Sequence, residues 1–163
     1  VRHTPGGNTV IAPLAAAALA ATMTVAPAPA VKAKPCKDRV VAWIEEAGFK
    51  GANVRVAWAI AQRESNGNPN ESSYPDLGLM QLNAPSWQHT KYWPANVYDP
   101  IQNLTAVRRM VRDMGWQPWG LRVKRGVVTY DFSAYGGWSS WHHQNWIVEP
   151  FERYYAQFPK ACR

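Results

Sequence analysis

Residues 61–69 read Ala-Gln-Arg-Glu-Ser-Asn-Gly-Asn-Pro, and residues 78–82 read Gly-Leu-Met-Gln-Leu. The first stretch places Glu64 at the end of an apolar helix, directly before an Asn-Gly-Asn-Pro sequence that breaks the helix. A Glu held between apolar neighbours at the edge of a cleft is desolvated, so it can stay protonated and act as a general acid. The alternative for a lone Glu is a solvated carboxylate or an ion pair with a neighbour such as Arg63.

Hydrophobic periodicity around this stretch predicts a mainly helical domain. Asn53 is the expected N-cap of the helix that carries the Glu, and Asp99 is the expected N-cap of a later helix that has Pro100 in its first turn. Residues 116–146 follow no regular pattern and are rich in Gly, Trp, Ser and His. We therefore expect a single compact helical domain whose long loops build the functional site. The predicted helices are 38–49, 54–64, 100–114 and a short last one at 150–157.

Two further motifs follow in order along the chain. Residues 99–104 read Asp-Pro-Ile-Gln-Asn-Leu, and residues 134–137 read Ala-Tyr-Gly-Gly. Together with the Glu-Ser pair at 64–65 and the Gly-Leu-Met-Gln stretch at 78–81, this ordered set resembles the soluble lytic transglycosylase (SLT) domain of the lysozyme-like superfamily. The resemblance covers about 40–137. It implies a mainly α fold of the lysozyme-like α+β superfamily, with long loops around a glycan-binding cleft.

The resemblance also implies a reaction. An SLT domain cuts the β-1,4 bond between N-acetylmuramic acid (MurNAc) and N-acetylglucosamine (GlcNAc) in peptidoglycan, and Glu64 matches its general acid and base. In the family mechanism the substrate's own N-acetyl group stabilises the anomeric carbon. The ionised Glu then takes the proton of the 6-hydroxyl, so that a 1,6-anhydro ring forms without water. One carboxylate suffices for this reaction, and we expect neither a cofactor nor a metal.

Further site residues carry over from the family motifs. Ser65 and Gln81 match residues that shape the site and contact the substrate. Tyr135 matches the Tyr of the closing triplet, which would orient the catalytic acid or the N-acetyl group; the alternative is an aromatic side chain packed in a Gly-rich turn. The chain departs from the family at Gly136, where the triplet often has Asn, and at Asn83, where many members have Met. Contacts with individual sugars are therefore expected to differ.

A site Ser lies between the two main motifs in many family members, and two residues of this chain compete for the position. Counting forward from Glu64 selects Ser73, whereas counting back from Gly78 selects Ser72. The sequence leaves this choice open.

Asp76 is a possible second carboxylate. If it held a water molecule opposite Glu64, the reaction would become hydrolysis with two carboxyl groups, as in goose-type lysozymes. The alternative is that residues 74–76, Tyr-Pro-Asp, simply form a turn. A third hypothesis is a non-catalytic module that binds the cell wall. The retained Glu-Ser and Gly-Leu-Met-Gln motifs argue against it, because binding alone has no need of an acid in an apolar pocket.

The charge balance indicates an anionic partner. The chain has 163 residues, enough for one domain of ordinary size, and 18 Lys plus Arg against 11 Asp plus Glu give a net charge of +7. The Arg residues are scattered over several segments and no nucleic-acid-binding motif accompanies them. The expected partner is therefore the glycan strand of an anionic cell wall, with no nucleic acid, and the protein is expected to be a monomer.

Nine Trp are many for this length. Trp43 and Trp58 lie on helix faces and are expected in the core, and two or three of the others are expected to stack on sugar rings. The pair His142 and His143 has no further ligands at suitable spacing, so it is expected at the surface or in packing and not on a metal. The Trp expected in or near loops are Trp87, Trp93, Trp116, Trp119, Trp138, Trp141 and Trp146.

The N-terminal segment and the two cysteines indicate export. Residues 1–30 are apolar and rich in Ala and Pro, which predicts a signal peptide cleaved before Val31 or, alternatively, an N-terminal anchor. Residues 31–163 would then form the secreted domain, with membrane contact only if the segment is not cleaved. Cys36 and Cys162 lie at the two ends of this domain, and an oxidising compartment favours a disulfide between them.

Overall fold

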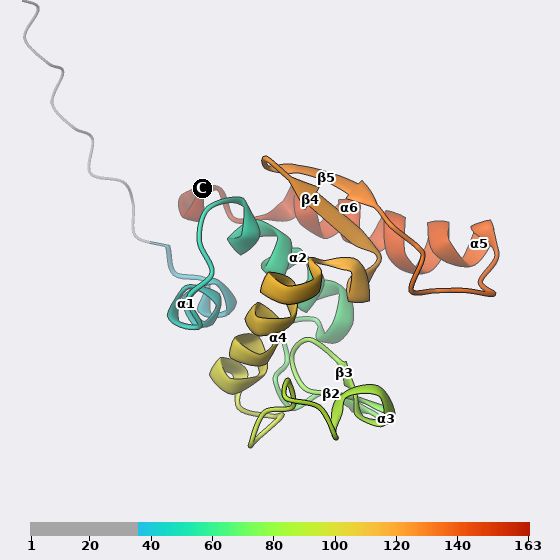
Figure 1. Ribbon diagram of the computed structural model, residues 1–163. Coiled ribbons are helices and arrows are strands. Elements are labelled where there is room, and N and C mark those ends of the chain that lie inside the picture. Colours follow the sequence, from blue (N-terminus) through green and yellow to red (C-terminus); the bar gives the residue numbers. More distant parts are fainter. Residues whose placement is uncertain (1–35) are drawn as a thin grey trace, which may run out of the picture. The chain divides into compact units, whose positions relative to one another are not determined.

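Helix α2 (Ala52–Ser65) runs through the centre of the computed structural model, which describes residues 36–163 (Figure 1). Helices α1 (Arg39–Glu46) and α6 (Glu149–Gln157) pack against α2, and α4 (Pro100–Met114) packs against α1. α2 is buried over most of its circumference, as expected for a helix with apolar residues on nearly every side. The mainly helical domain expected from the sequence is confirmed.

Two small antiparallel sheets flank these helices. One has the strand order β1-β2-β3, and the other is the hairpin β4–β5, whose Tyr130 packs against Phe151 of α6. In Figure 1 the three-stranded sheet and α3 lie at the end of the domain where α2 finishes. The remaining elements are β1 (Ser72–Ser73), β2 (Asp76–Leu77), β3 (Leu82–Asn83), α3 (Ala84–Trp87), η1 (Gln117–Trp119), β4 (Leu121–Lys124), β5 (Val127–Tyr130), α5 (Ser140–His142), η2 (His143–Val148) and η3 (Lys160–Cys162).

One of the two predicted helix caps is correct. The side chain of Asp99 accepts a hydrogen bond from the backbone N–H of Gln102 at 2.9 Å and begins α4. The prediction for Asn53 is wrong, because Gly51 occupies the N-cap position of α2. Asn53 instead accepts a hydrogen bond from the indole N–H of Trp116 at 2.9 Å, which ties α2 to the segment after α4.

The prediction of an irregular segment at 116–146 is wrong in part, since its longest stretch without helix or strand is 131–139. The segment contains the β4–β5 hairpin, whose turn residues Arg125 and Gly126 both have positive φ, at 51° and 80°. Such turns favour Asn or Gly at both central positions, so the sequence with Arg at the first of them did not predict a hairpin. The last helix also begins well before its predicted start, because α5, the π-helical segment η2 and α6 follow one another without a break over 140–157.

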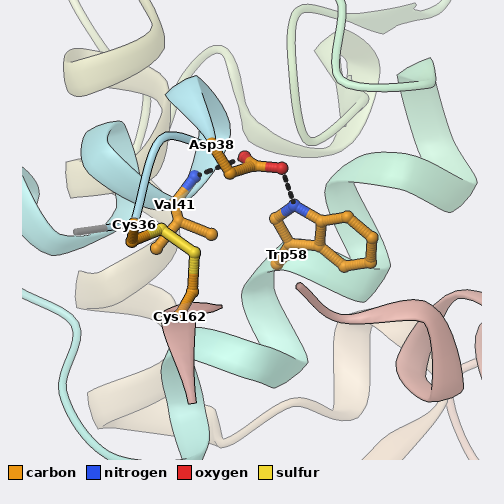
Figure 2. Close-up of a disulfide and its surroundings, with 5 residues drawn as sticks. All are labelled: Cys36, Asp38, Val41, Trp58 and Cys162. Atoms are coloured by element: carbon orange, nitrogen blue, oxygen red, sulfur yellow. Dashed lines mark hydrogen bonds between the residues drawn. A yellow bond between two sulfur atoms is a disulfide. The ribbon is translucent and has the colours of Figure 1, made fainter. Parts of the chain in front are cut away.

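A disulfide joins the two ends of the described domain (Figure 2). Cys36 and Cys162 are bonded across a sequence separation of 126, with a Cα–Cα distance of 4.8 Å, so the expected pair is present. Beside this bond, Asp38 accepts hydrogen bonds from the backbone N–H of Val41 at 3.0 Å and from the indole N–H of Trp58 at 3.2 Å. Asp38 therefore caps α1 and fixes α1 to α2 at the same point.

The tryptophans divide between core and surface. Trp58 is buried as expected, whereas Trp43 is half-buried, with the guanidinium of Arg39 lying 4.8 Å from its ring centroid. Trp116 and Trp119, which were expected near loops, are buried. The predicted leader at 1–30 lies outside the described residues. Within the described part, no helix has both the length and the hydropathy that a membrane span requires.

Candidate active site

A cleft of about 750 Å³ lies beside the C-terminal end of α2. It brings together Glu64 from α2, Ser73 from β1, Asp76 from β2, Gln81 from the following turn and Tyr135 from the loop after β5. These residues come from separate segments of the chain, and the sequence had singled out every one of them. The shared cleft supports a common functional site.

Glu64 is paired with its neighbour in the chain. Its side chain is 25% exposed, and the Nε and Nη2 atoms of Arg63 both donate to Oε1. Arg63 is itself 6% exposed and also donates to the backbone carbonyl of Trp119 at 3.3 Å. The alternative ion pair is therefore present, and the cleft around Glu64 also contains the apolar side chains of Leu82, Trp119 and Ile147. No described residue donates to Oε2, so this oxygen is the one that can meet a ligand in the cleft.

Ser65 does not line the cleft. It is buried, and its hydroxyl lies 3.0 Å from the carbonyl oxygen of Ala61 and 2.7 Å from that of Leu79. The predicted contact between Ser65 and substrate therefore has no support in the structure. The Ser65 hydroxyl instead holds the 78–81 turn against the last turn of α2, next to Glu64.

Asn103 holds the same turn through a second hydrogen bond. It is fully buried, accepts a hydrogen bond from the Met80 N–H at 3.2 Å, and donates to the Val97 carbonyl at 2.9 Å. The 78–81 turn packs closely against Val97, because a Cβ added at Gly78 would lie 2.2 Å from the backbone oxygen of Val97. Trp119 adds a third bond, from its indole N–H to the Met80 carbonyl at 3.3 Å. The motif residues thus position the turn that carries the cleft residue Gln81.

Replacing Asn103 tests this arrangement. We expect Asn103→Leu to lower the free energy of unfolding by about 2 to 4 kcal/mol, because the Met80 N–H and the Val97 carbonyl would both lose their partner in a buried site. Urea unfolding followed by tryptophan fluorescence measures the loss. Asn70→Leu, at an exposed position, is the matched control and should change the stability little. A loss below about 1 kcal/mol at Asn103 would contradict the assigned role.

The structure places the two candidate serines differently. Ser73 lines the cleft, whereas the Ser72 hydroxyl accepts a hydrogen bond from the Tyr98 hydroxyl at 3.3 Å. Successive residues of a strand point to opposite faces, which explains why only one of the pair faces the cleft. Ser73 pairs with Asp76 across the β1–β2 ladder.

Asp76 is not a simple turn residue. The turn consists of residues 74–75, and Asp76 follows it as the first residue of β2, half-buried in the same cleft as Glu64. The side-chain amide of Asn83 donates to its Oδ1 at 2.9 Å. The sequence had noted Asn83 only as a departure from the family. Its amide holds a second carboxylate of the cleft in a defined orientation.

Gln81 and Tyr135 are both fixed by backbone carbonyls. The Gln81 amide nitrogen donates to the Gly78 carbonyl at 2.8 Å, so its amide oxygen is the atom that can accept from a ligand. The Tyr135 hydroxyl donates to the Pro118 carbonyl at 2.8 Å and therefore does not orient Glu64 directly. Burial raises the pKa of Tyr135, so the phenol is neutral at physiological pH.

Comparison with known proteins gives one match. The model of the transglycosylase SLT domain matches residues 41–131, more than half of the chain. The chain belongs to the transglycosylase SLT domain family. No curated protein sequence and no solved structure gives a significant match. Membership in the SLT family assigns the chain, at family level, to lytic transglycosylase-type cleavage of peptidoglycan.

The SLT match ends before part of the cleft. It includes Glu64, Asp76 and Gln81, but Tyr135 and the whole helical segment 140–157 follow it in the chain. Sequence reasoning expected two or three of seven loop tryptophans to meet sugar but did not say which, because aromatic residues in a segment without periodicity give no signal of where they face. Four of those seven line the cleft, namely Trp87, Trp119, Trp138 and Trp146.

The His pair has local partners. The Nδ1 atom of His142 lies 2.8 Å from the Ser139 hydroxyl, and the ring of His143 stacks on Phe132 with centroids 4.1 Å apart. Over residues 36–163, no group of three or more His, Cys, Asp or Glu side chains is arranged to hold a metal ion.

Proposed function

We propose that this SLT domain cuts the MurNAc–GlcNAc β-1,4 bond of peptidoglycan and releases 1,6-anhydroMurNAc ends, with Glu64 as general acid and then base. The observation that carries the proposal is the position of Glu64 at the end of α2, in one cleft with Ser73, Gln81 and Tyr135. Its Oε1 is held by Arg63, and no described residue donates to Oε2. We therefore assign proton transfer to the second oxygen.

The proposed reaction begins with protonated Glu64. Its proton passes to O4 of the leaving GlcNAc as the bond from C1 of MurNAc to that oxygen breaks, and the N-acetyl oxygen bonds to C1. The 6-hydroxyl oxygen then attacks C1 and displaces the N-acetyl oxygen, while its proton returns to Glu64. Arg63 lies against the carboxylate formed in the first step and stabilises its charge. Neither water nor a second carboxylate takes part.

A hydrolytic reaction is the second candidate, and the place of Asp76 favours it. Asp76 lines the same cleft and is oriented by Asn83, so it could hold a water molecule on the opposite face of the sugar. In that case Glu64 would remain the acid, and the products would have reducing ends.

Mass spectrometry of soluble muropeptides distinguishes the two reactions. We expect digestion of purified peptidoglycan to give fragments that end in 1,6-anhydroMurNAc, and we expect Asp76→Asn to give the same ends. If the native protein gave fragments with reducing ends and Asp76→Asn did not, the hydrolytic reaction would be established instead. If the native protein released no fragments at all, a wall-binding module would be the better interpretation.

We further propose that the protein acts outside the cell on the wall. The support is the Cys36–Cys162 disulfide, which persists in an oxidising compartment, and the net charge of +7, which suits an anionic polymer.

A further inference from the structure

Three tryptophans are exposed on the segment that follows the SLT match. Trp138 is 44% exposed, and Trp141 and Trp146 are each 62% exposed. They come from the loop before α5, from α5 itself and from η2. Large aromatic side chains gathered on one exposed surface mark a binding site more often than scattered ones do. We call Trp138, Trp141, Trp146 and the intervening His142 the aromatic strip.

The aromatic strip is continuous with the cleft. Trp138 and Trp146 line the cleft that contains Glu64, and the ring centroid of Trp138 lies 5.1 Å from that of Tyr135. The strip continues from Trp138 to His142, whose ring centroids lie 5.8 Å apart. It then continues to Trp141, whose ring centroid lies 5.3 Å from that of His142. Trp141 is not part of the cleft lining, so the strip leads from the cleft out onto the surface.

The charge of this segment selects the kind of ligand. Residues 132–148 contain no Lys, Arg, Asp or Glu, although the chain has 18 Lys plus Arg. A surface for anionic lipid or nucleic acid would place Lys or Arg beside the aromatic rings. The exposed neighbours here are instead uncharged hydrogen-bonding residues, Ser139, Gln144 and Asn145. This combination suits contact with the sugar rings of a glycan strand, which offer apolar ring faces and uncharged hydroxyl and acetamido groups.

The local backbone supports a functional role for the strip. η2 is a π-helical segment of six residues, and such segments occur frequently at functional sites. It contains Trp146 and the buried Ile147, and both line the cleft. The wider helical turn therefore occurs where the strip joins the cleft.

We infer that the aromatic strip is an outer glycan subsite, which binds sugars of the strand beyond those at Glu64. The inference rests on the proposed function, because it takes the glycan strand as the occupant of the cleft. It predicts that affinity rises with strand length until the sugars reach Trp141. Because the strip lies beyond residue 131, it is a feature of this chain outside the matched SLT region.

Length-dependent binding tests the inference. The full chain carrying Glu64→Gln, which prevents turnover, is titrated calorimetrically with the disaccharide GlcNAc-MurNAc and with long peptide-free glycan strands. We expect Trp141→Ala to weaken binding of the long strands by about 3- to 10-fold and to leave disaccharide binding unchanged. Trp141→Phe, which keeps an aromatic ring, should retain most of the long-strand affinity. Val127→Ala, at an exposed apolar position in the β4–β5 hairpin, is the control.

Several results would overturn the subsite. If Trp141→Ala bound long strands as tightly as the parent protein, the subsite would be wrong. It would also be wrong if the variant lost the same affinity for long strands and for the disaccharide. A shift from dimer to monomer in Trp141→Ala, seen by sedimentation, would make the strip an interface between copies. Cleavage that survives in Glu64→Gln would count against the proposed function and not against the strip, whose readout is the length dependence of binding.

Discussion

Glu64→Gln is expected to slow the release of soluble fragments from peptidoglycan by about 10²- to 10⁴-fold, the contribution typical of a general acid and base. Gln has nearly the same shape as Glu and keeps an oxygen that can accept from Arg63, whose guanidinium is almost fully buried. It cannot give a proton to the glycosidic oxygen or take one from the 6-hydroxyl. The loss should therefore appear in turnover and not in glycan binding. Chromatography of released muropeptides measures it.

The same substitution at a surface position is the matched control. Glu46 lies exposed on α1, and Glu46→Gln should cleave at the native rate. Thermal unfolding of both variants, followed by circular dichroism, shows whether either change has affected the fold. If Glu64→Gln kept its rate within a few-fold of the native protein, the assignment of Glu64 as the proton donor would be wrong.

Removal of the disulfide is expected to have the largest effect on stability. The bond between Cys36 and Cys162 closes a loop across a separation of 126 residues. In the chain-entropy model, a loop of this length restricts the unfolded chain by about 4 to 5 kcal/mol. We therefore expect Cys36→Ala combined with Cys162→Ala to lower the free energy of unfolding by that amount. Urea unfolding followed by tryptophan fluorescence measures the difference.

Reduction of the native protein provides the comparison for the double variant. A reducing agent should lower the stability of the native protein to nearly that of the variant, and it should leave the variant unchanged. A loss below about 1 kcal/mol would show that the constraint on the unfolded chain is small in this protein. The hydrogen bonds of Asp38, which join α1 to α2 beside the disulfide, do not depend on the bond between the two sulfur atoms (Figure 2).

Features that depend on neighbouring residues could be predicted from the sequence. The apolar spacing in α1, α2 and α4 and the Asp99 cap are local, since a helix forms its hydrogen bonds within a few residues. The cap predicted at Asn53 failed because a distant side chain, Trp116, takes its oxygen. The hairpin at 121–130 was missed because Arg125 occupies a turn position that usually carries Asn or Gly.

The candidate site could be predicted in part. The motifs identified Glu64 and Gln81, and Asp76 was named separately as a possible second carboxylate. The structure brings all three into one cleft, but the motifs did not separate residues that line it from residues that support it. Ser65 and Asn103 carry the motif pattern equally well, yet both are buried and hold the 78–81 turn. A sequence motif gives residue types and their spacing, but it does not say which of these residues face solvent.

The sequence by itself determined the helical class, the family and the place of Glu64 at a helix end, because periodicity, caps and motif spacing are properties of short segments. Only the tertiary structure decided that Arg63 holds Glu64, that Ser73 and not Ser72 lines the cleft, and that Trp138 and Trp146 complete its wall. These outcomes depend on contacts between segments far apart in the chain. Such contacts follow from how α2, α6 and the small sheets pack, and no local pattern records that packing.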